Sequence, residues 1–291
     1  MAKGRNTTSR TRRRSAEPAN RPPRERLNLI RALEKETGTR LLCYVSGHCA
    51  EISRDDTLGF VDMLSTVPQG AAVDLLLHTL GGDIDVTEKL VMLLRAKVGD
   101  HGGLRVIVPD CAKSAGTLIA LGANRIVMSD SSELGTIDPQ IWLKDGRGNE
   151  TRHSVLHYLD AYAAYEQRVI ENPTDLSARV MIEKFEPATL HKLNGVRERA
   201  RILAENLLKP RGLNWSAIVN EKLMNIKEYQ SHGQPLGWKV VERLGLDVDY
   251  LSQVDARWKR YWRLYLQLRL AIKDNQRVFE SNSTSMVLEA Q

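Results

Sequence analysis

The chain has 291 residues, of which 42% are hydrophobic and 27% charged, and its formal net charge is +6. This length can bury one sizeable core and a further extension. The three cysteines, Cys43, Cys49 and Cys111, are too few and odd in number for a disulfide framework, which indicates a reducing compartment. They also lack the spacing of a metal site, and we expect neither a metal nor another cofactor. No apolar run approaches the ~18 residues of a membrane span and no signal-peptide core is present, so we expect a cytoplasmic protein.

The positive charge belongs to the N-terminal segment. Residues 1–26 hold nine Lys or Arg against two Glu and almost no apolar residues, whereas the rest of the chain is close to neutral. We expect a disordered basic tail there. Such a tail binds anionic lipid, nucleic acid without sequence preference, or an acidic partner through charge, or it serves only solubility.

Apolar strands and amphipathic helices alternate over the next hundred residues. This pattern predicts an α/β fold with a buried, mainly parallel sheet and right-handed crossover helices. The predicted strands are Leu41–Val45, Val73–His78, Leu104–Val108 and Arg125–Met128, and the predicted helices are Asp55–Ser65, Asp85–Lys97 and Ser114–Gly122.

A double glycine, Gly81-Gly82, follows the second of these strands. Paired glycines permit positive φ angles and leave their amide hydrogens unshielded, as an oxyanion hole requires. Because ligand sites of parallel sheets lie at the carboxyl ends of the strands, this turn is a candidate binding corner.

Ser114 lies where the third strand passes into a helix of small residues. Two interpretations are open, a structural N-cap and a nucleophile whose charge is stabilised by the helix N–H groups. For the second one, we expect Ser114 and the double glycine to face the same small void. The third motif, Leu134-Gly-Thr-Ile-Asp-Pro-Gln, places Asp138 24 residues after Ser114.

These three motifs, in this order, resemble the Clp protease and crotonase-like superfamily, most closely its serine dehydrogenase proteinase branch, which is related to signal peptide peptidase A. The resemblance covers about Arg40 to Asp249. It implies a Clp protease/crotonase-like fold and an ATP-independent serine peptidase that hydrolyses polypeptides through an acyl-enzyme on Ser114. The amides of Gly81, Gly82 and Ala115 would then hold the oxyanion, and the chain would form a homo-oligomer.

The chain departs from the family pattern at the position of the catalytic base. A Clp protease has His-Gln-Pro where this chain has Asp138-Pro139-Gln140. The segment that begins Ser231-His232 resembles the closing Clp segment, and His232 falls within one residue of the family's acid. The roles are then exchanged, with Ser114 as nucleophile, His232 as base and Asp138 as the group that orients it. The alternative is a Ser-Lys dyad, as in signal peptide peptidase relatives, with Lys144 or Lys184 as base.

The second half of the chain is predicted to be helical, over 153–171, 175–185, 188–208 and 215–225, and to form a covering and assembly layer. We expect one peptidase domain over 27–250, followed by an amphipathic helix and a frayed tail over 251–291. That helix has Trp258, Trp262 and Tyr265 on one face, which either pack on the protein or lie in a membrane interface at the inner face of the membrane.

Two classes of function remain at this stage. The first is the serine peptidase. The second is a protein without hydrolytic activity on the same fold, either an inactive scaffold or an acyl-thioester protein that uses the same oxyanion hole.

Overall fold

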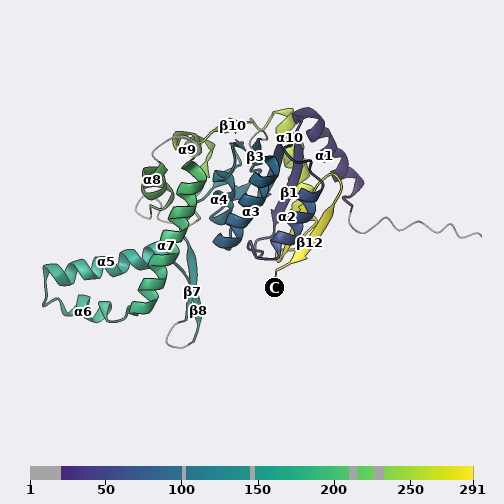
Figure 1. The fold of residues 1–291 in the computed structure, drawn as a ribbon. Coiled ribbons are helices and arrows are strands. Elements are labelled where there is room, and N and C mark those ends of the chain that lie inside the picture. The colour runs from purple at the N-terminus through teal and green to yellow at the C-terminus, as the bar shows by residue number, and fades with distance from the viewer. Residues whose placement is uncertain (1–20, 100–102, 145–147, 210–214, 226–232, 291) are drawn as a thin grey trace, which may run out of the picture.

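The structure is a computed structural model that describes residues 21–290, except for 100–102, 145–147, 210–214 and 226–232. Its central sheet has seven strands in the order β10-β5-β3-β2-β1-β11-β12 (Figure 1). The strands from β10 to β1 are parallel, and β11 and β12 are antiparallel. Their bounds are β1 Arg40–Ser46, β2 Val73–His78, β3 Leu104–Ile107, β5 Arg125–Met128, β10 Val248–Tyr250, β11 Gln276–Glu280 and β12 Ser285–Glu289. The predicted α/β class with a mainly parallel sheet is confirmed.

Helices cover both faces of this sheet. Side chains of β2 alternate between the faces, so that Leu75 and Leu77 join one core and Leu76 joins the other. The first core packs against α2 (Asp56–Ser65), α3 (Ile84–Val98) and α4 (Ala115–Leu121), and the second against α1 (Arg24–Thr37) and α10 (Ala256–Leu270). Because both faces are buried, the strands have near-continuous apolar sequences rather than alternating ones.

A helical arm extends from the body of the molecule (Figure 1). It comprises the hairpin β7 (Gln140–Lys144) and β8 (Glu150–Ser154), then α5 (Val155–Glu171), α6 (Leu176–Ile182) and α7 (Pro187–Leu208). A small separate core of Val155, Leu159 and Leu193 holds its base together. The predicted helix start at residue 153 is wrong, because 150–154 pair with β7 and Ser154 caps α5 by accepting from the His157 N–H.

Three short segments form a second sheet beside the central one. It comprises β4 (Cys111–Ala112), β6 (Glu133–Leu134) and β9 (Leu236–Gly237), in the order β4-β6-β9. The remaining elements, α8 (Trp215–Ile218), η2 (Val219–Leu223) and α9 (Trp238–Arg243), lie between the arm and the end of the central sheet.

The C-terminal segment is part of the core, and the expectation of a frayed tail after Phe279 is wrong. Val278 and Phe279 are buried on opposite faces of β11, which pairs with β1, and β12 pairs with β11. The expected boundary after residue 26 is also displaced, because α1 begins at Arg24. The rest of the predicted basic tail, residues 1–20, lies outside the described residues.

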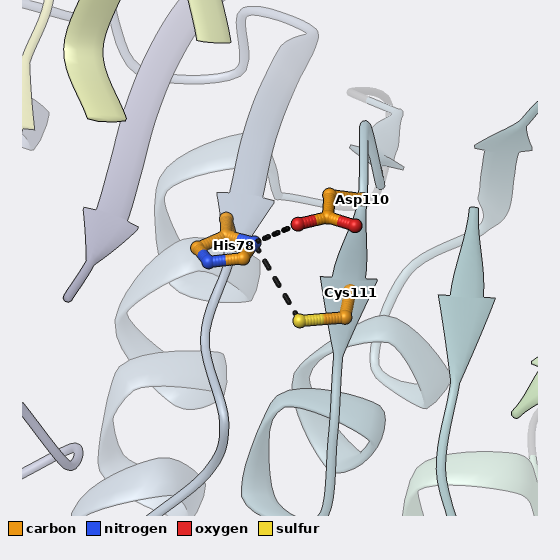
Figure 2. Close-up of side chains that lie close together, drawn as sticks. All are labelled: His78, Asp110 and Cys111. Atoms are coloured by element: carbon orange, nitrogen blue, oxygen red, sulfur yellow. Dashed lines mark hydrogen bonds and ion pairs between the residues drawn. The ribbon is translucent and has the colours of Figure 1, made fainter. Parts of the chain in front are cut away.

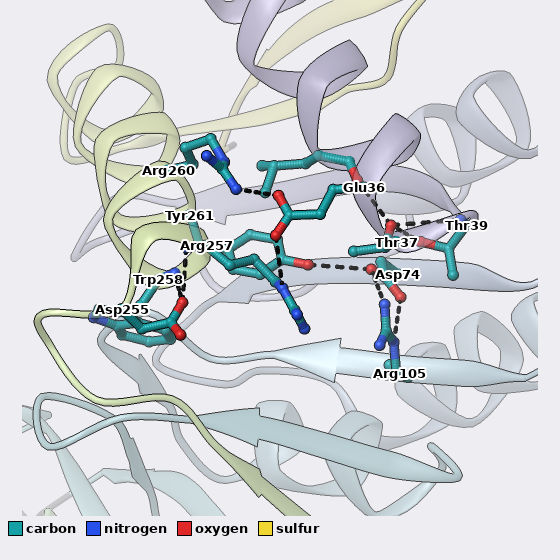
Figure 3. A network of polar contacts seen from close by, with 11 residues as sticks. Glu36, Thr37, Thr39, Asp74, Arg105, Asp255, Arg257, Trp258, Arg260 and Tyr261 are labelled. Carbon is teal, nitrogen blue, oxygen red and sulfur yellow. Dashed lines mark hydrogen bonds and ion pairs between the residues drawn. The ribbon is translucent and has the colours of Figure 1, made fainter.

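A polar network anchors α10 to the sheet and to α1 (Figure 3). Tyr261 donates to Asp74 of β2 at 3.2 Å, and Arg105 of β3 donates to both oxygens of the same carboxylate at 2.8 and 2.7 Å. Trp258 is buried, whereas Trp262 is partly exposed. Most of the aromatic face of this helix therefore packs on the protein itself. Within the described residues, no helix is both long and apolar enough to cross a bilayer.

A buried ion pair lies under the C-terminal hairpin. Arg277 of β11 and Asp56 of α2 are 3.1 Å apart and almost without solvent exposure. Tyr44 donates to the same carboxylate at 2.8 Å, and the Ser53 N–H donates at 3.2 Å. The ion pair thereby links β11 to α2.

Replacing Arg277 by Met should therefore destabilise the fold by about 3 to 5 kcal/mol, because the Asp56 carboxylate would stay buried without its countercharge. Urea unfolding measures this loss. The matched control is Arg263→Met, which removes an arginine from the exposed pair with Glu25 and should change the midpoint far less. Equal losses in the two variants would contradict the importance of the buried pair.

Asp56 should also give the stability a pH dependence. Burial raises its pKa to about 6, against the opposing charge of Arg277. Since the folded state then binds more protons than the unfolded state between about pH 4 and pH 6, the contribution of this carboxyl to stability is full at low pH and falls as the pH rises. The free energy of unfolding of wild type relative to Asp56→Asn should fall by about 2 to 3 kcal/mol over this range. Ser65→Asn, at an exposed and uncharged position of the same helix, is the control and should keep the wild-type slope.

Candidate functional site

Ser114 has a strained backbone at the entrance of α4. Its φ of 50° makes it the one non-glycine residue with positive φ in the described part of the chain. Its side chain makes no capping hydrogen bond, although it occupies the N-cap position. The hydroxyl is therefore not engaged as a helix cap. Backbone strain of this kind costs about 1–3 kcal/mol and is concentrated at functional sites.

The double glycine packs directly against the turn of Ser114. A Cβ on Gly81 would lie 2.8 Å from the Ser114 Cβ, and a Cβ on Gly82 would lie 2.3 Å from the Ile52 nitrogen. Both glycines have positive φ, 115° and 147°. Only glycine satisfies the two requirements together, so the sequence motif is explained by this close approach.

The amides of the two turns differ in their partners. The Gly81 N–H donates to Thr79 Oγ1 at 3.2 Å. The N–H groups of Gly82 and Ala115, in contrast, donate to no other group among the described residues. Of the three predicted oxyanion donors, two are thus open to a ligand and one is already engaged.

Ser114 and Gly82 line the same cavity, which has a volume of about 450 Å³. Pro139, which follows Asp138, and Gln140, the first residue of β7, form another part of its wall. The void that the sequence analysis expects between the nucleophile turn and the double glycine is therefore present. The other lining residues are Glu51, Asp83, Ile84, Asp85, Arg152, Lys192, Gly195, Val196 and Arg199.

The strands of the small sheet β4-β6-β9 adjoin the three predicted catalytic residues in the sequence. Ser114 follows β4, Asp138 follows β6, and His232 precedes β9. Asp138 is buried and accepts from the Leu156 N–H at 3.2 Å. His232 lies outside the described residues, but the carbonyl of Gly233, the next residue, accepts from Lys113 at 3.4 Å.

The lysines of the alternative dyad do not line this cavity. Lys144 is exposed at the end of β7 and pairs with Glu150 at 3.4 Å, and Lys184 is exposed after α6 in the arm. Lys113, next to Ser114, is buried and pairs with Glu133 at 2.7 Å.

Lys192 of α7 does line the cavity, and the sequence analysis did not identify it. The available signal was the spacing of Lys192, Val196 and Arg199, which places all three on one face of a helix.

A second polar cluster lies behind the two turns, on the other face of the sheet. His78 at the end of β2 is 3.5 Å from Asp110 Oδ2 and 3.6 Å from Cys111 Sγ, both measured from its Nδ1 atom (Figure 2). Burial lowers the pKa of His78 to about 4, against the opposing effect of Asp110, and raises the pKa of the Cys111 thiol to about 12. In the described part of the chain, these residues form the group that could hold a metal ion.

The fold and the two turns define a class, the ClpP-like α/β proteins with a serine at a strand-to-helix turn beside a glycine pair. Residues 24–157 match the sequence model of the ClpP-like SDH-type serine proteinases. The resemblance seen in the sequence motifs is therefore confirmed over this part of the chain.

Two uncharacterized proteins of Methanocaldococcus jannaschii are similar in sequence. MJ1495 is 30% identical over 40% of this chain and 42% of its own length, and MJ0137 is 28% identical over 68% of this chain and 60% of its own length. The chain thus spans less than two thirds of the length of either relative.

Two solved structures of the 1510-N membrane-bound stomatin-specific protease are also similar. A mutant in complex with a substrate peptide is 15% identical, with a TM-score of 0.28, over 78% of this chain and 97% of that chain. A second mutant is 17% identical, with a TM-score of 0.29, over 73% and 97%.

Replacing Gly81 by Ala should displace Ser114, because the added methyl would lie 2.8 Å from the serine Cβ. We expect a loss of about 1–3 kcal/mol in urea unfolding and a loss of any reactivity that the serine has. The control is Gly70→Ala, which also has positive φ, 77°, but open space around the new methyl. If Gly70→Ala impairs Ser114 as much as Gly81→Ala does, the steric explanation is wrong.

Proposed function

We propose that the protein is a serine peptidase that cleaves polypeptides through an acyl-enzyme on Ser114, without ATP. The match of residues 24–157 to a serine proteinase family supports this class of reaction. The observation that carries the proposal is the shared cavity, in which the Ser114 turn and the Gly82 turn face the same space.

The oxyanion would be held by two amides rather than three. The N–H groups of Gly82 and Ala115 are open to a ligand, whereas that of Gly81 donates to Thr79. When the Ser114 oxygen attacks a carbonyl carbon, negative charge develops on the carbonyl oxygen, and preorganised N–H donors stabilise that charge. Gly81 contributes by its missing side chain, which leaves room for the serine.

Proton transfer is assigned to His232, oriented by Asp138. The small sheet supports this assignment, since its paired strands β4, β6 and β9 lie within a few residues of Ser114, Asp138 and His232 in the sequence. A neutral imidazole accepts the serine proton and returns it to the leaving amine. The lysine dyad has less support, because neither Lys144 nor Lys184 lines the cavity.

A polypeptide substrate fits the size and shape of the site. The 450 Å³ cavity at Ser114 shares Glu51 and Arg152 with a neighbouring cavity of about 610 Å³. An extended chain can lie across both cavities. The second cavity is also lined by Trp142 of the β7-β8 hairpin, a large apolar surface for a substrate side chain.

Assembly and location stay predictions. We propose that the arm serves homo-oligomer formation, since it exposes apolar side chains that do not line the cavity at Ser114, namely Ile170, Leu176, Val180 and Met181. The basic tail remains the candidate for an anionic partner, in a protein of the cytoplasm that is either free or peripheral to the inner membrane face. The buried position of Trp258 gives α10 less apolar surface for such a role.

Fluorophosphonate labelling followed by intact-mass measurement tests the nucleophile. The wild-type chain should gain one adduct, Ser114→Ala should gain none, and Ser65→Ala, at an exposed serine of α2, should label like wild type. A folded wild-type chain without an adduct would favour the alternative, an inactive scaffold or an acyl-thioester protein.

The same assay separates the two candidate bases. His232→Ala should slow labelling by about 10²–10⁴-fold, the usual contribution of a general base. Asp138→Asn should slow it as well, whereas Lys184→Ala and Lys144→Ala should leave it unchanged. An effect confined to one of the lysine variants would replace the triad by the dyad.

A further inference from the structure

We propose that His78, Asp110 and Cys111 form a binding site for a divalent transition metal of the Zn²⁺ type. The three side chains offer one nitrogen, one oxygen and one sulfur ligand, and these atoms all lie within 4.8 Å of one another. Two of the residues are almost completely buried, and Asp110 is partly exposed. The site is separate from the Ser114 cavity, which none of the three residues lines.

The two distances from His78 Nδ1 to the other ligand atoms are close to those around a tetrahedral ion. With typical zinc bond lengths, tetrahedral geometry places nitrogen and oxygen ligands about 3.3 Å apart, and nitrogen and sulfur ligands about 3.6 Å apart. The measured separations from His78 Nδ1 are 3.5 Å to Asp110 Oδ2 and 3.6 Å to Cys111 Sγ. A nitrogen–oxygen distance of this length is too long for a good hydrogen bond, but it is suitable for a shared ion. The third pair, the Asp110 oxygen and the Cys111 sulfur, lies within 4.8 Å.

The chemistry of the ligands is also suitable. Imidazole, thiolate and carboxylate are the three ligand types found at zinc sites. The His78 imidazole can bind a metal through a lone pair on Nδ1 when its ring proton is on Nε2. Binding would displace the proton of the Cys111 thiol, which passes to solvent, so that one Zn²⁺ is neutralised by one thiolate and one carboxylate.

A tyrosine supports the site from outside. The Tyr265 hydroxyl donates to Asp110 Oδ2 at 2.8 Å and is 3.4 Å from His78 Nδ1. A hydrogen bond of this kind orients a metal-binding carboxylate. The partly exposed side of Asp110 offers a path for the metal and a place for water as the fourth ligand. His48 and Arg269 act on His78 through their charges, and Arg269 pairs with Asp274. Lys113 and Glu133, which pair with each other, act on Cys111.

The metal would link the two turns of the candidate active site. His78 precedes Gly81 by three residues, and Cys111 precedes Ser114 by three residues. The same segments are already joined by a hydrogen bond from the Thr79 N–H to the Cys111 carbonyl at 3.1 Å. A bound ion would therefore fix the double glycine relative to the serine, and the three ligands would act as positioning residues.

Cobalt titration of the chelator-treated full chain tests the proposal. Wild type should bind one Co²⁺ with a thiolate-to-cobalt charge-transfer band, release about one proton, and lose the band when Zn²⁺ is added. Cys111→Ser should lose the band. Cys49→Ser, which removes an exposed thiol, is the matched control and should keep it.

Two further variants keep the test decisive if Cys111→Ser folds poorly. Asp110→Asn alters a partly exposed side chain and should weaken binding, and Tyr265→Phe should weaken it by about 10–100-fold. Circular dichroism confirms that each variant is folded. Absence of Co²⁺ and Zn²⁺ binding by folded wild type, or a band that follows Cys49 instead of Cys111, would overturn the proposal. Because binding is measured directly, its outcome does not depend on whether Ser114 is a nucleophile.

Discussion

The close approach of two backbone turns is the constraint on which the rest of the site depends. Gly81 meets the Ser114 turn, Gly82 meets Ile52, and Gly116, inside α4, meets the Thr79 side chain. At each contact a Cβ would be closer than 3.0 Å to a neighbouring atom. The absence of side chains at these points lets the ends of β2 and β4 lie together. As a result, a strained serine and two open amides face one small volume.

Much of the parallel core could be predicted from the sequence, because its signals are local. Val73–His78 and Arg125–Met128 are apolar runs of strand length, and they form β2 and β5 with the predicted bounds. Ser114 and Gly82 could also be predicted as site residues, since parallel strands place their carboxyl ends at one edge of the sheet. For these residues, knowledge of the strand order was not required.

The remaining features depend on contacts between residues far apart in the chain, and no local pattern reveals them. Arg277 makes its segment look polar, although the side chain is buried by pairing with Asp56. Lys192 reaches the cavity only because α7 returns from the arm. The cluster of His78 and Cys111 is likewise absent from any spacing rule, since the two residues lie on separate segments that the sheet brings side by side.

The position of β11 and β12 has a consequence for how the chain folds during synthesis. One edge of β1 pairs with residues 277–280, which follow it by more than 230 residues. Until those residues leave the ribosome, a long apolar strand has a row of unpaired backbone groups, which is a template for aggregation. The nascent chain must therefore tolerate or shield this edge, although α1, which is made just before β1, already packs on one face of the strand.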